Sequence, residues 1–299
     1  MQERQEFEPG SWINIVQPSD DELLFLSDSL AVPEDILRAA LDHDESARIE
    51  VEEDQVLLII DIPVRNESQG EFFYETLPLG IIFKGDFIIT VCLQDHPVLQ
   101  DFRLGRVRGF FTYKRTRFTL QILFRVASLY LSYLKQIDRQ SIEVERQLHR
   151  STRNKELFLL LSLMKSLVYF STSLKANALV FNKLIKGDVV KMYPEDQDVL
   201  EDVIIENRQA IEMAEVYSNI LSSTMDAFAS VISNNLNMVM KFLASVTIIL
   251  SIPAIVASLY GMNVLLPLQD RPFAFLFVLL IALGLSSLAA FVLARRGMF

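Results

Sequence analysis

Two long uncharged stretches near the C-terminus constrain the fold more than any other feature of the sequence. Residues 242–260 (19 residues) and 273–294 (22 residues) contain no charged side chain. A bilayer core of roughly 30 Å requires about 20 residues of helix. Both stretches are therefore predicted to cross a membrane as helices, and their place near the C-terminus excludes a signal peptide for either.

The charges that flank these stretches predict their orientation. Lys241 precedes the first stretch and Arg295 and Arg296 follow the second, whereas the segment between them carries only Asp270 and Arg271. Basic residues concentrate on the cytoplasmic side of a membrane. We therefore expect a multi-pass protein of the cell inner membrane with both termini in the cytoplasm.

Composition narrows the class of protein further. Cys92 is the only cysteine, so no intrachain disulfide is possible, which suits a reducing compartment. The net charge of −10 argues against a nucleic-acid partner and favours attraction of cations.

Residues 1–110 are predicted to form a cytoplasmic α/β domain with a small mixed sheet. Pro33 followed by two acidic residues is typical of a helix start, here over 33–41. Gly85-Asp86 indicates a hairpin turn. Alternating or continuous apolar runs predict strands over 12–16, 48–52, 56–62, 74–79, 81–83 and 87–92.

Residues 111–193 are predicted to form long antiparallel helices. The 77 residues from Phe110 to Lys186 contain neither glycine nor proline. The polar run at 150–153 is the expected break between two helices. The apolar run 157–161 is bounded by Glu156 and Lys165. It is too short to cross a membrane, and we interpret it as core packing.

A single helix is predicted over 194–261. Pro194 and the acids behind it suit a helix start, and the 58 residues from Glu195 to Ile252 contain no glycine or proline. Those residues alone would span about 87 Å. The helix would act as a stalk and continue into the first membrane span at 242–260. An external loop (262–272), the second span (273–294) and a basic cytoplasmic tail (295–299) follow. Such a long helix cannot bury its apolar stripe alone, so we expect an oligomeric bundle.

A polar stripe follows one face of this long helix. Its members recur every three or four residues, which places them on one side of a helix. A polar face in an apolar segment must meet protein or water rather than lipid. We interpret it as pore lining; the alternative is helix packing through small residues. The stripe comprises Asp226, Ser230, Ser233, Asn237, Met240, Ala244, Thr247 and Ser251, with Leu243 at its border.

Other chemistry is sparse. The segment from Glu195 to Asp226 contains nine acidic residues and one basic residue. Most are expected to be solvated or to complement a neighbouring helix, and a minority could bind divalent cations between subunits. The three histidines are scattered, and no nucleophile–base pair, phosphate loop or tetrahedral zinc pattern is present. We therefore expect neither an enzyme nor a prosthetic group.

The first span ends in Tyr260-Gly261-Met262-Asn263. Gly261 is expected to cap the helix with a positive φ. The Gly-Met-Asn sequence at the end of the first of two C-terminal spans resembles the signature of the CorA superfamily of divalent-cation transporters. Asp226, Asn237 and Met240 fall where that family has its pore acid, asparagine and methionine. Leu243 and Pro253 fall where it has its hydrophobic gate and a proline.

The resemblance covers the whole chain and implies an α+β membrane protein. Its parts would be an N-terminal α/β cytoplasmic domain, a long helical stalk and two C-terminal transmembrane helices, assembled in lipid as a CorA-like homopentamer. The implied activity is channel-like transport of Mg²⁺, with Co²⁺ and Ni²⁺ as further candidate cargo, driven by the membrane potential.

The resemblance also implies roles for individual residues. Gly261, Met262 and Asn263 would form the selectivity filter. The pore lining would comprise Asp226, Ser233, Asn237, Met240, Leu243, Thr247 and Ser251. Mg²⁺ would also act as a regulatory ligand at Asp202 and, by a looser alignment, Asp95.

One departure from the family pattern concerns the loop after the signature. Magnesium-transporting members usually carry a glutamate there, whereas this chain has Leu266-Pro-Leu-Gln269 and no acid before Asp270, the candidate at the outer mouth. A ZntB-like Zn²⁺ transporter is therefore an alternative. From another class, a non-transporting membrane-anchored sensor or scaffold is the third hypothesis.

Overall fold

The computed structural model describes residues 8–52, 54–68, 71–148, 155–186, 189–263 and 272–298. Its contacts divide the chain into two compact units, residues 1–223 and 224–299. The division falls inside helix α6 (Pro194–Tyr260), which contributes to both units.

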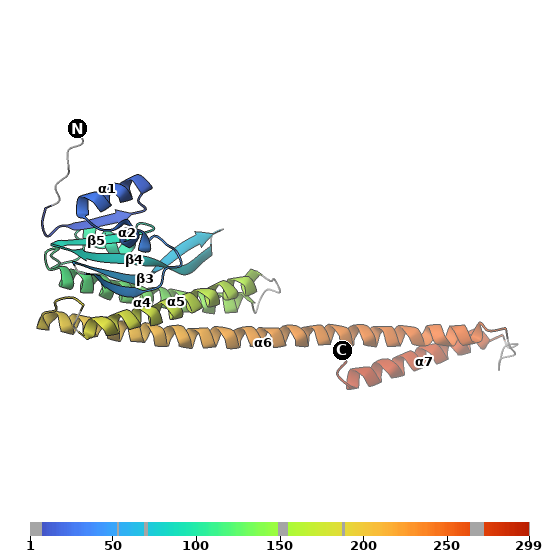
Figure 1. Ribbon diagram of the computed structural model, residues 1–299. Helices are drawn as coiled ribbons and strands as arrows, with labels where there is room; N and C mark the ends of the chain where they lie inside the picture. The colour runs from blue at the N-terminus through green and yellow to red at the C-terminus, as the bar shows by residue number, and fades with distance from the viewer. Residues whose placement is uncertain are drawn as a thin grey trace. The chain divides into compact units, whose positions relative to one another are not determined.

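A five-stranded sheet forms the centre of the first unit (Figure 1). Its strands lie in the order β1-β5-β4-β3-β2; β1 runs parallel to β5, and the other pairs are antiparallel. The predicted mixed sheet is therefore confirmed. The strands are β1 (Trp12–Val16), β2 (Arg48–Glu52), β3 (Gln55–Ser68), β4 (Glu71–Lys84) and β5 (Phe87–Cys92).

Strand β4 corrects one prediction. Residues 74–79 and 81–83 are not two strands, because β4 runs through Gly80 without a break. A Cβ atom on Gly80 would lie 2.7 Å from the Cβ of Ala40, so the glycine lets the chain after α2 (Glu34–Ala39) approach the sheet closely. The predicted turn at Gly85-Asp86 is confirmed: Gly85 has a φ of +52°, and Lys84 pairs with Phe87.

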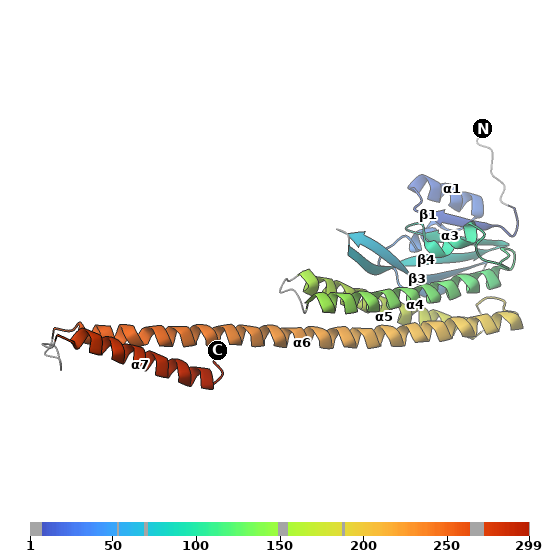
Figure 2. The same cartoon turned by 180° about the vertical axis from the view of Figure 1, so that it is seen from behind.

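Helices cover both faces of this sheet (Figures 1 and 2). Helices α1 (Asp20–Leu30) and α2 pack on one face through one apolar cluster. Helices α3 (Pro97–Arg103), α4 (Arg115–Leu148) and α5 (Lys155–Ile185) belong to the other cluster. The two long helices predicted between 111 and 193 are confirmed, and the expected break at 150–153 lies outside the described residues.

Helices α1 and α3 were missing from the prediction. A local signal for α1 was present, because Ser19 and Glu22 form a capping box. The Ser19 N–H donates to the Glu22 carboxylate at 2.8 Å, and the Glu22 N–H donates to Ser19 Oγ at 3.4 Å. Helix α3 begins with Pro97, and proline is favourable in a first helical turn because its missing N–H would have no partner within the helix there.

Within the described residues, three helices are long and apolar enough to span a membrane: α5, α6 and α7 (Ala274–Arg295). Helix α5 instead supplies core to the first unit, where Leu163, Leu167 and Phe170 are completely buried. The interpretation of 157–161 as core packing holds for Leu160, which is buried, but not for Phe158, which is exposed.

The N-terminal part of α6 belongs to the same core as α4 and α5. Leu200, Val203, Ala210 and Ala214 are fully buried in this cluster. The side-chain amide of Asn207 donates to the carbonyl oxygen of Leu174 on α5 at 3.0 Å, and both groups are buried. This part of the long helix is thus fixed by specific contacts.

The second unit pairs the C-terminal part of α6 with α7. The prediction of one helix over 194–261 agrees with α6, which also passes through Pro253. Proline has no N–H, so the carbonyl of Ile249, four residues earlier, loses its helical donor. Ser286 Oγ on α7 lies 3.5 Å from that carbonyl oxygen and supplies a replacement.

Candidate functional site

The predicted pore-lining residues lie along the part of α6 that belongs to the second unit. Met240 and Leu243 are 58% and 53% exposed, although both are apolar. The polar members of the set, listed here, are exposed as well: Asp226, Ser233, Asn237, Thr247 and Ser251. Within one chain, therefore, none of the other segments that the structure describes covers these side chains.

Helix α7 packs on a different face of α6. Ser245 is completely buried, and its Oγ lies 3.2 Å from the carbonyl oxygen of Met298; Ile249 faces Ser286 as described above. With about 100° between successive residues, the direction of the polar stripe differs from this contact face by roughly a third of a turn. The stripe is therefore free to face other copies of the chain or water.

Hydroxyl groups on the stripe use their hydrogens within the helix. Thr247 Oγ1 donates to the carbonyl of Leu243 at 2.8 Å, and Ser251 Oγ donates to that of Ile248 at 2.9 Å. Ser230 Oγ donates to the carbonyl of Asp226 at 3.0 Å. The hydroxyl oxygens keep their lone pairs as acceptors. Such a face can accept hydrogen bonds from the water shell of a cation.

The helix ends as predicted at Gly261, but the expected positive φ is wrong: this residue is absent from the described glycines with positive φ. A Cβ atom on Gly261 would lie 3.3 Å from the carbonyl oxygen of Ala257 and 3.6 Å from that of Ser258. Both carbonyls belong to the last turn of α6, and the Gly261 N–H donates to that of Ala257 at 2.9 Å, which continues the helical hydrogen bonds by one residue. Met262 and Asn263 follow and are exposed. Asp270 and the loop 266–269 lie outside the described residues.

The two predicted regulatory carboxylates lie in the first unit. Asp95 Oδ2 accepts hydrogen bonds from Gln100 Nε2 and Arg103 Nη2, both at 2.9 Å. Asp202 is exposed on α6 and lines an open groove with Arg117 and Arg125. Among the residues that the structure describes, no three His, Cys, Asp or Glu side chains gather as a metal site. A regulatory ion would need additional ligands.

Sequence reasoning missed the two serines that join α6 to α7. Ser245 and Ser286 are polar residues within apolar spans, and polar groups in a membrane segment need partners. That signal was available for both. Their contact partners could not be inferred, because Ile249 lies on the other helix and Met298 lies just beyond the end of α7.

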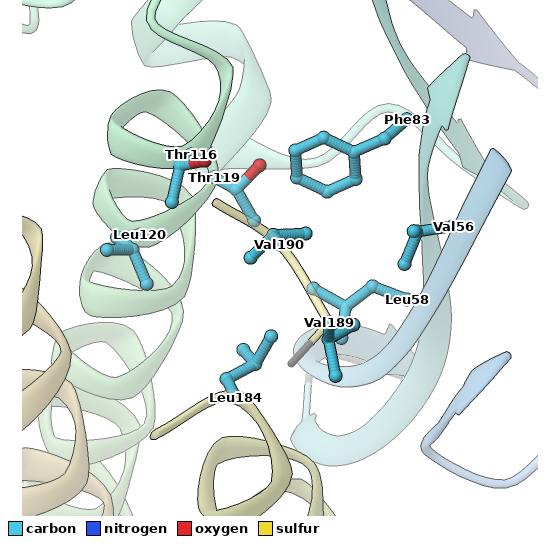
Figure 3. A pocket seen from close by; sticks show the side chains of 9 residues that line it. All are labelled: Val56, Leu58, Phe83, Thr116, Thr119, Leu120, Leu184, Val189 and Val190. Atoms are coloured by element: carbon cyan, nitrogen blue, oxygen red, sulfur yellow. The ribbon is translucent and has the colours of Figure 1, made fainter. Parts of the chain in front are cut away.

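A small cavity in the first unit is a packing defect rather than a binding site (Figure 3). It offers about 10 Å³ of free space, at the lower limit for one water molecule. The side chains of Leu58, Phe83 and Val190 are among those that line it. Thr119 is 3% exposed, and its hydroxyl oxygen has no hydrogen-bond partner. Figure 3 shows this oxygen directed toward Phe83.

Replacing Thr119 by valine is expected to stabilise the protein by about 1 kcal/mol, because an unpartnered buried polar group costs roughly 1–3 kcal/mol. Thr116→Val is the matched control: Thr116 Oγ1 donates to the carbonyl of Lys191 at 2.9 Å, so this variant should lose stability. Thermal unfolding of both variants in detergent measures the difference. A lower melting temperature for Thr119→Val would contradict the interpretation.

Comparison with known proteins extends the geometric evidence. A family described as "CorA-like Mg2+ transporter protein" matches residues 8–295. The cobalt/magnesium transport protein CorA of Methanocaldococcus jannaschii is 28% identical over 296 residues, which cover 96% of this chain and 90% of that protein. The complete structure of the magnesium transporter CorA from the same organism has a TM-score of 0.85 at 27% identity and covers 96% of this chain and 91% of that chain.

The ZntB-like branch is more distant. The ZntB cytoplasmic domain from Vibrio parahaemolyticus has a TM-score of 0.61 at 14% identity, covering 76% of this chain and 90% of that chain, which shows a shared fold alone.

The resemblance to the CorA superfamily that the sequence indicated is confirmed by these comparisons. The fold class apart from its oligomeric state, and the expectation of a transporter rather than an enzyme, are confirmed as well. The match over nearly its whole length shows that the chain belongs to the family of CorA-like Mg²⁺ transporter proteins.

Proposed function

We propose that this chain forms a homopentamer in the cell inner membrane, in which the α6 helices surround one pathway for hydrated divalent cations. Mg²⁺ is the main cargo, with Co²⁺ and Ni²⁺ as further candidates. One observation carries the proposal: the polar stripe of α6 is exposed on a face that α7 leaves uncovered. In a membrane such a face requires protein or water beside it.

The stripe suggests an order of events along the pathway. Asp226 attracts cations at the inner end, and Asn237 offers an amide oxygen to their water shells. Met240 and Leu243 form an apolar constriction that closes by dewetting. Thr247 and Ser251 continue the polar lining toward the signature.

Gly261, Met262 and Asn263 form the filter at the outer mouth, and Asp270 adds negative charge in the loop beyond. Mg²⁺ gives up its water reluctantly. Amide oxygens of Asn263 therefore hold the hydrated ion by accepting hydrogen bonds from its water ligands. This mode needs no dehydration and no tight metal site.

The membrane potential drives uptake. It is worth about 2.3 kcal/mol per charge per 100 mV, hence about 4.6 kcal/mol for a divalent ion. Both termini lie in the cytoplasm, together with the α/β domain (1–110), the antiparallel helices (111–193) and the stalk (from 194). The apolar side chains of α7, among them Phe275 and Leu280, are exposed and suit contact with lipid.

Regulation by intracellular Mg²⁺ involves Asp202 and Asp95 in this proposal. Exposure of Asp202 supports an intersubunit role, because a carboxylate at the surface of one chain can meet ligands from another. Asp95 would have to exchange its contacts with Gln100 and Arg103 for the ion.

Ion uptake by the purified full-length protein in vesicles tests this function. We expect Mg²⁺ uptake that rises with an inside-negative potential and persists without a proton gradient. Zn²⁺ uptake that requires a proton gradient, without Mg²⁺ uptake, would favour the ZntB-like alternative. Absence of uptake for every cation would contradict transport and favour a sensor or scaffold.

A further inference from the structure

An open apolar groove runs between α6 and α7 within the second unit. It offers about 430 Å³ of free space. Ile248 and Ile252 line it from α6, and its other lining side chains are apolar residues of α7. Those of α7 are Leu285, Leu288, Ala289, Val292 and Leu293. The groove therefore suits a hydrocarbon chain rather than a polar ligand.

The α6 wall of this groove leads to a basic residue. Lys241, Ser245, Ile248 and Ile252 follow one another at spacings of four, three and four, which places them on one face of the helix. Ile248 and Ile252 line the groove, whereas Ser245 contacts the chain just after α7. The groove face of α6 thus ends in the exposed Lys241.

The α7 wall leads to a basic residue at the same spacing. Leu285, Ala289, Val292 and Arg296 also recur after four, three and four residues, and the first three line the groove. The helical turn includes Arg296, because its N–H donates to the carbonyl of Val292 at 3.1 Å. Arg295, the last residue of α7, lies beside it.

A specific contact brings these two basic ends together. Gly297 has a φ of +66°, and the Met298 N–H donates to the carbonyl of Leu293 at 3.2 Å, as expected where a glycine ends a helix in the left-handed conformation. This turn carries Met298 to α6. Ser245 Oγ lies 3.2 Å from the carbonyl oxygen of Met298 and 2.8 Å from that of Lys241. The backbones of Lys241 and Met298 therefore meet at one buried hydroxyl.

The positive charge at this end has no acidic side chain near it in the second unit. Lys241, Arg295 and Arg296 are all exposed, and the Arg295 guanidinium lies 4.9 Å from the ring of Phe291. Asp226 precedes Lys241 by about 22 Å of helix, well beyond the roughly 8 Å over which exposed charges act at physiological salt. After Asp226 the only acidic side chain lies in the segment between the two spans. An anion from outside the chain can therefore complement this end.

The length of the groove matches one leaflet of a membrane. Ile252 lies about 16 Å along α6 from Lys241. The hydrocarbon core of a bilayer is about 30 Å thick, so one leaflet contributes about 15 Å. A phospholipid has its phosphate at the membrane surface and its acyl chains extend to the midplane. The distance from the basic end to the far end of the groove fits such a molecule.

We propose that the groove between α6 and α7 binds an anionic phospholipid. Its phosphate lies at Lys241 and Arg296, with Arg295 nearby, and an acyl chain follows the apolar walls. Free phosphate would leave the groove empty, and a phospholipid without net charge would leave the basic end without a counter-charge. The site requires a membrane but not transport; only its place in the cytoplasmic leaflet rests on the orientation proposed above.

Quenching of tryptophan fluorescence by brominated lipids tests the site with the full-length protein in vesicles. Leu288→Trp places the indole in the groove, and Leu283→Trp places it about 140° away around α7. The two leucines are 59% and 55% exposed, so the pair is closely matched. Trp12, the only native tryptophan, lies in the first unit and gives a constant background.

Brominated phosphatidylglycerol is compared with brominated phosphatidylcholine, each as a minor component of phosphatidylcholine vesicles. A basic residue near an anionic lipid contributes about fivefold in affinity. Leu288→Trp should therefore report a preference for phosphatidylglycerol of about tenfold or more. Leu283→Trp should be quenched in proportion to the bulk composition of the vesicle.

Removing the basic side chains should remove the preference. In the Leu288→Trp protein, Lys241→Gln and Arg296→Gln should each lower the relative affinity for phosphatidylglycerol about fivefold. Lys241→Arg keeps the charge and should retain the preference. Arg208→Gln removes an exposed cation of α6 in the first unit, and this control should leave the preference unchanged.

Equal lipid preferences at Leu288→Trp and Leu283→Trp would overturn the proposal, as would a preference that persists in both glutamine variants. If neither lipid quenched Leu288→Trp while both quenched Leu283→Trp, a second copy of the chain would cover the groove and the lipid site would be wrong. Absence of Mg²⁺ uptake by vesicles that show the lipid preference would refute the proposed transport function and leave the lipid site standing.

Discussion

Replacing Asn263 by alanine is expected to reduce Mg²⁺ uptake at least tenfold. The exposed side chain follows the end of α6 directly, where its amide oxygen can accept a hydrogen bond from a water ligand of the ion. A hydrogen bond to a charged partner contributes about 1.5–3 kcal/mol, and roughly 1.4 kcal/mol already corresponds to tenfold. Every copy of the chain in an assembly would lose this contact together.

Asn235→Ala is the matched control for Asn263→Ala. It is the same substitution within α6 rather than just beyond its end, and Asn235 lies nearly opposite the stripe when about 100° separates successive residues. Uptake should remain close to that of the wild type. Size-exclusion profiles of both variants establish that the assembly is retained. If Asn263→Ala transported Mg²⁺ at the wild-type rate, the assignment of the filter would be wrong.

Local periodicity and composition predicted most of the long elements. The helix over 194–261 followed from the absence of glycine and proline between 195 and 252 and agrees with α6. Strands β1, β2 and β5 agree with the predicted ranges, because each is a short alternating or apolar run between turn residues. These features depend on residues that are close together in the chain, so a single sequence is enough to predict them.

Two of the errors concern glycines. Gly80 was expected to break a strand. Its missing side chain instead makes room for Ala40, which packs against the sheet at this point. Gly261 was expected to cap the helix with a positive φ, but its N–H continues the helical hydrogen bonds by donating to the carbonyl of Ala257. A glycine supplies either conformational freedom or space, and the sequence alone does not distinguish these roles.

Some parts of the candidate site could be predicted from the sequence and others could not. The stripe on α6 could be predicted because its members share one helix and one period. The contact between Ser245 and Met298 could not, since 53 residues separate them. The replacement of Pro253's missing donor by Ser286 likewise required the packing of α7 on α6.

Cysteines placed on the stripe should make transport sensitive to a water-soluble thiol reagent. The chain suits this measurement because Cys92, its only cysteine, is buried. Burial also raises the pKa of the Cys92 thiol to about 11, so the reactive thiolate is scarce at neutral pH. A reagent that enters a water-filled pathway would react with stripe cysteines and obstruct the ions.

The measurement that tests the central claim most directly compares block of Mg²⁺ uptake between two sets of single-cysteine variants. Asn237→Cys, Thr247→Cys and Ser251→Cys place the thiol on the stripe. Asn235→Cys and Val246→Cys place it on other faces of α6. We predict nearly complete block in the first set and uptake close to that of untreated protein in the second. Equal block in both sets, or none at the stripe, would contradict a pathway lined by this face of α6.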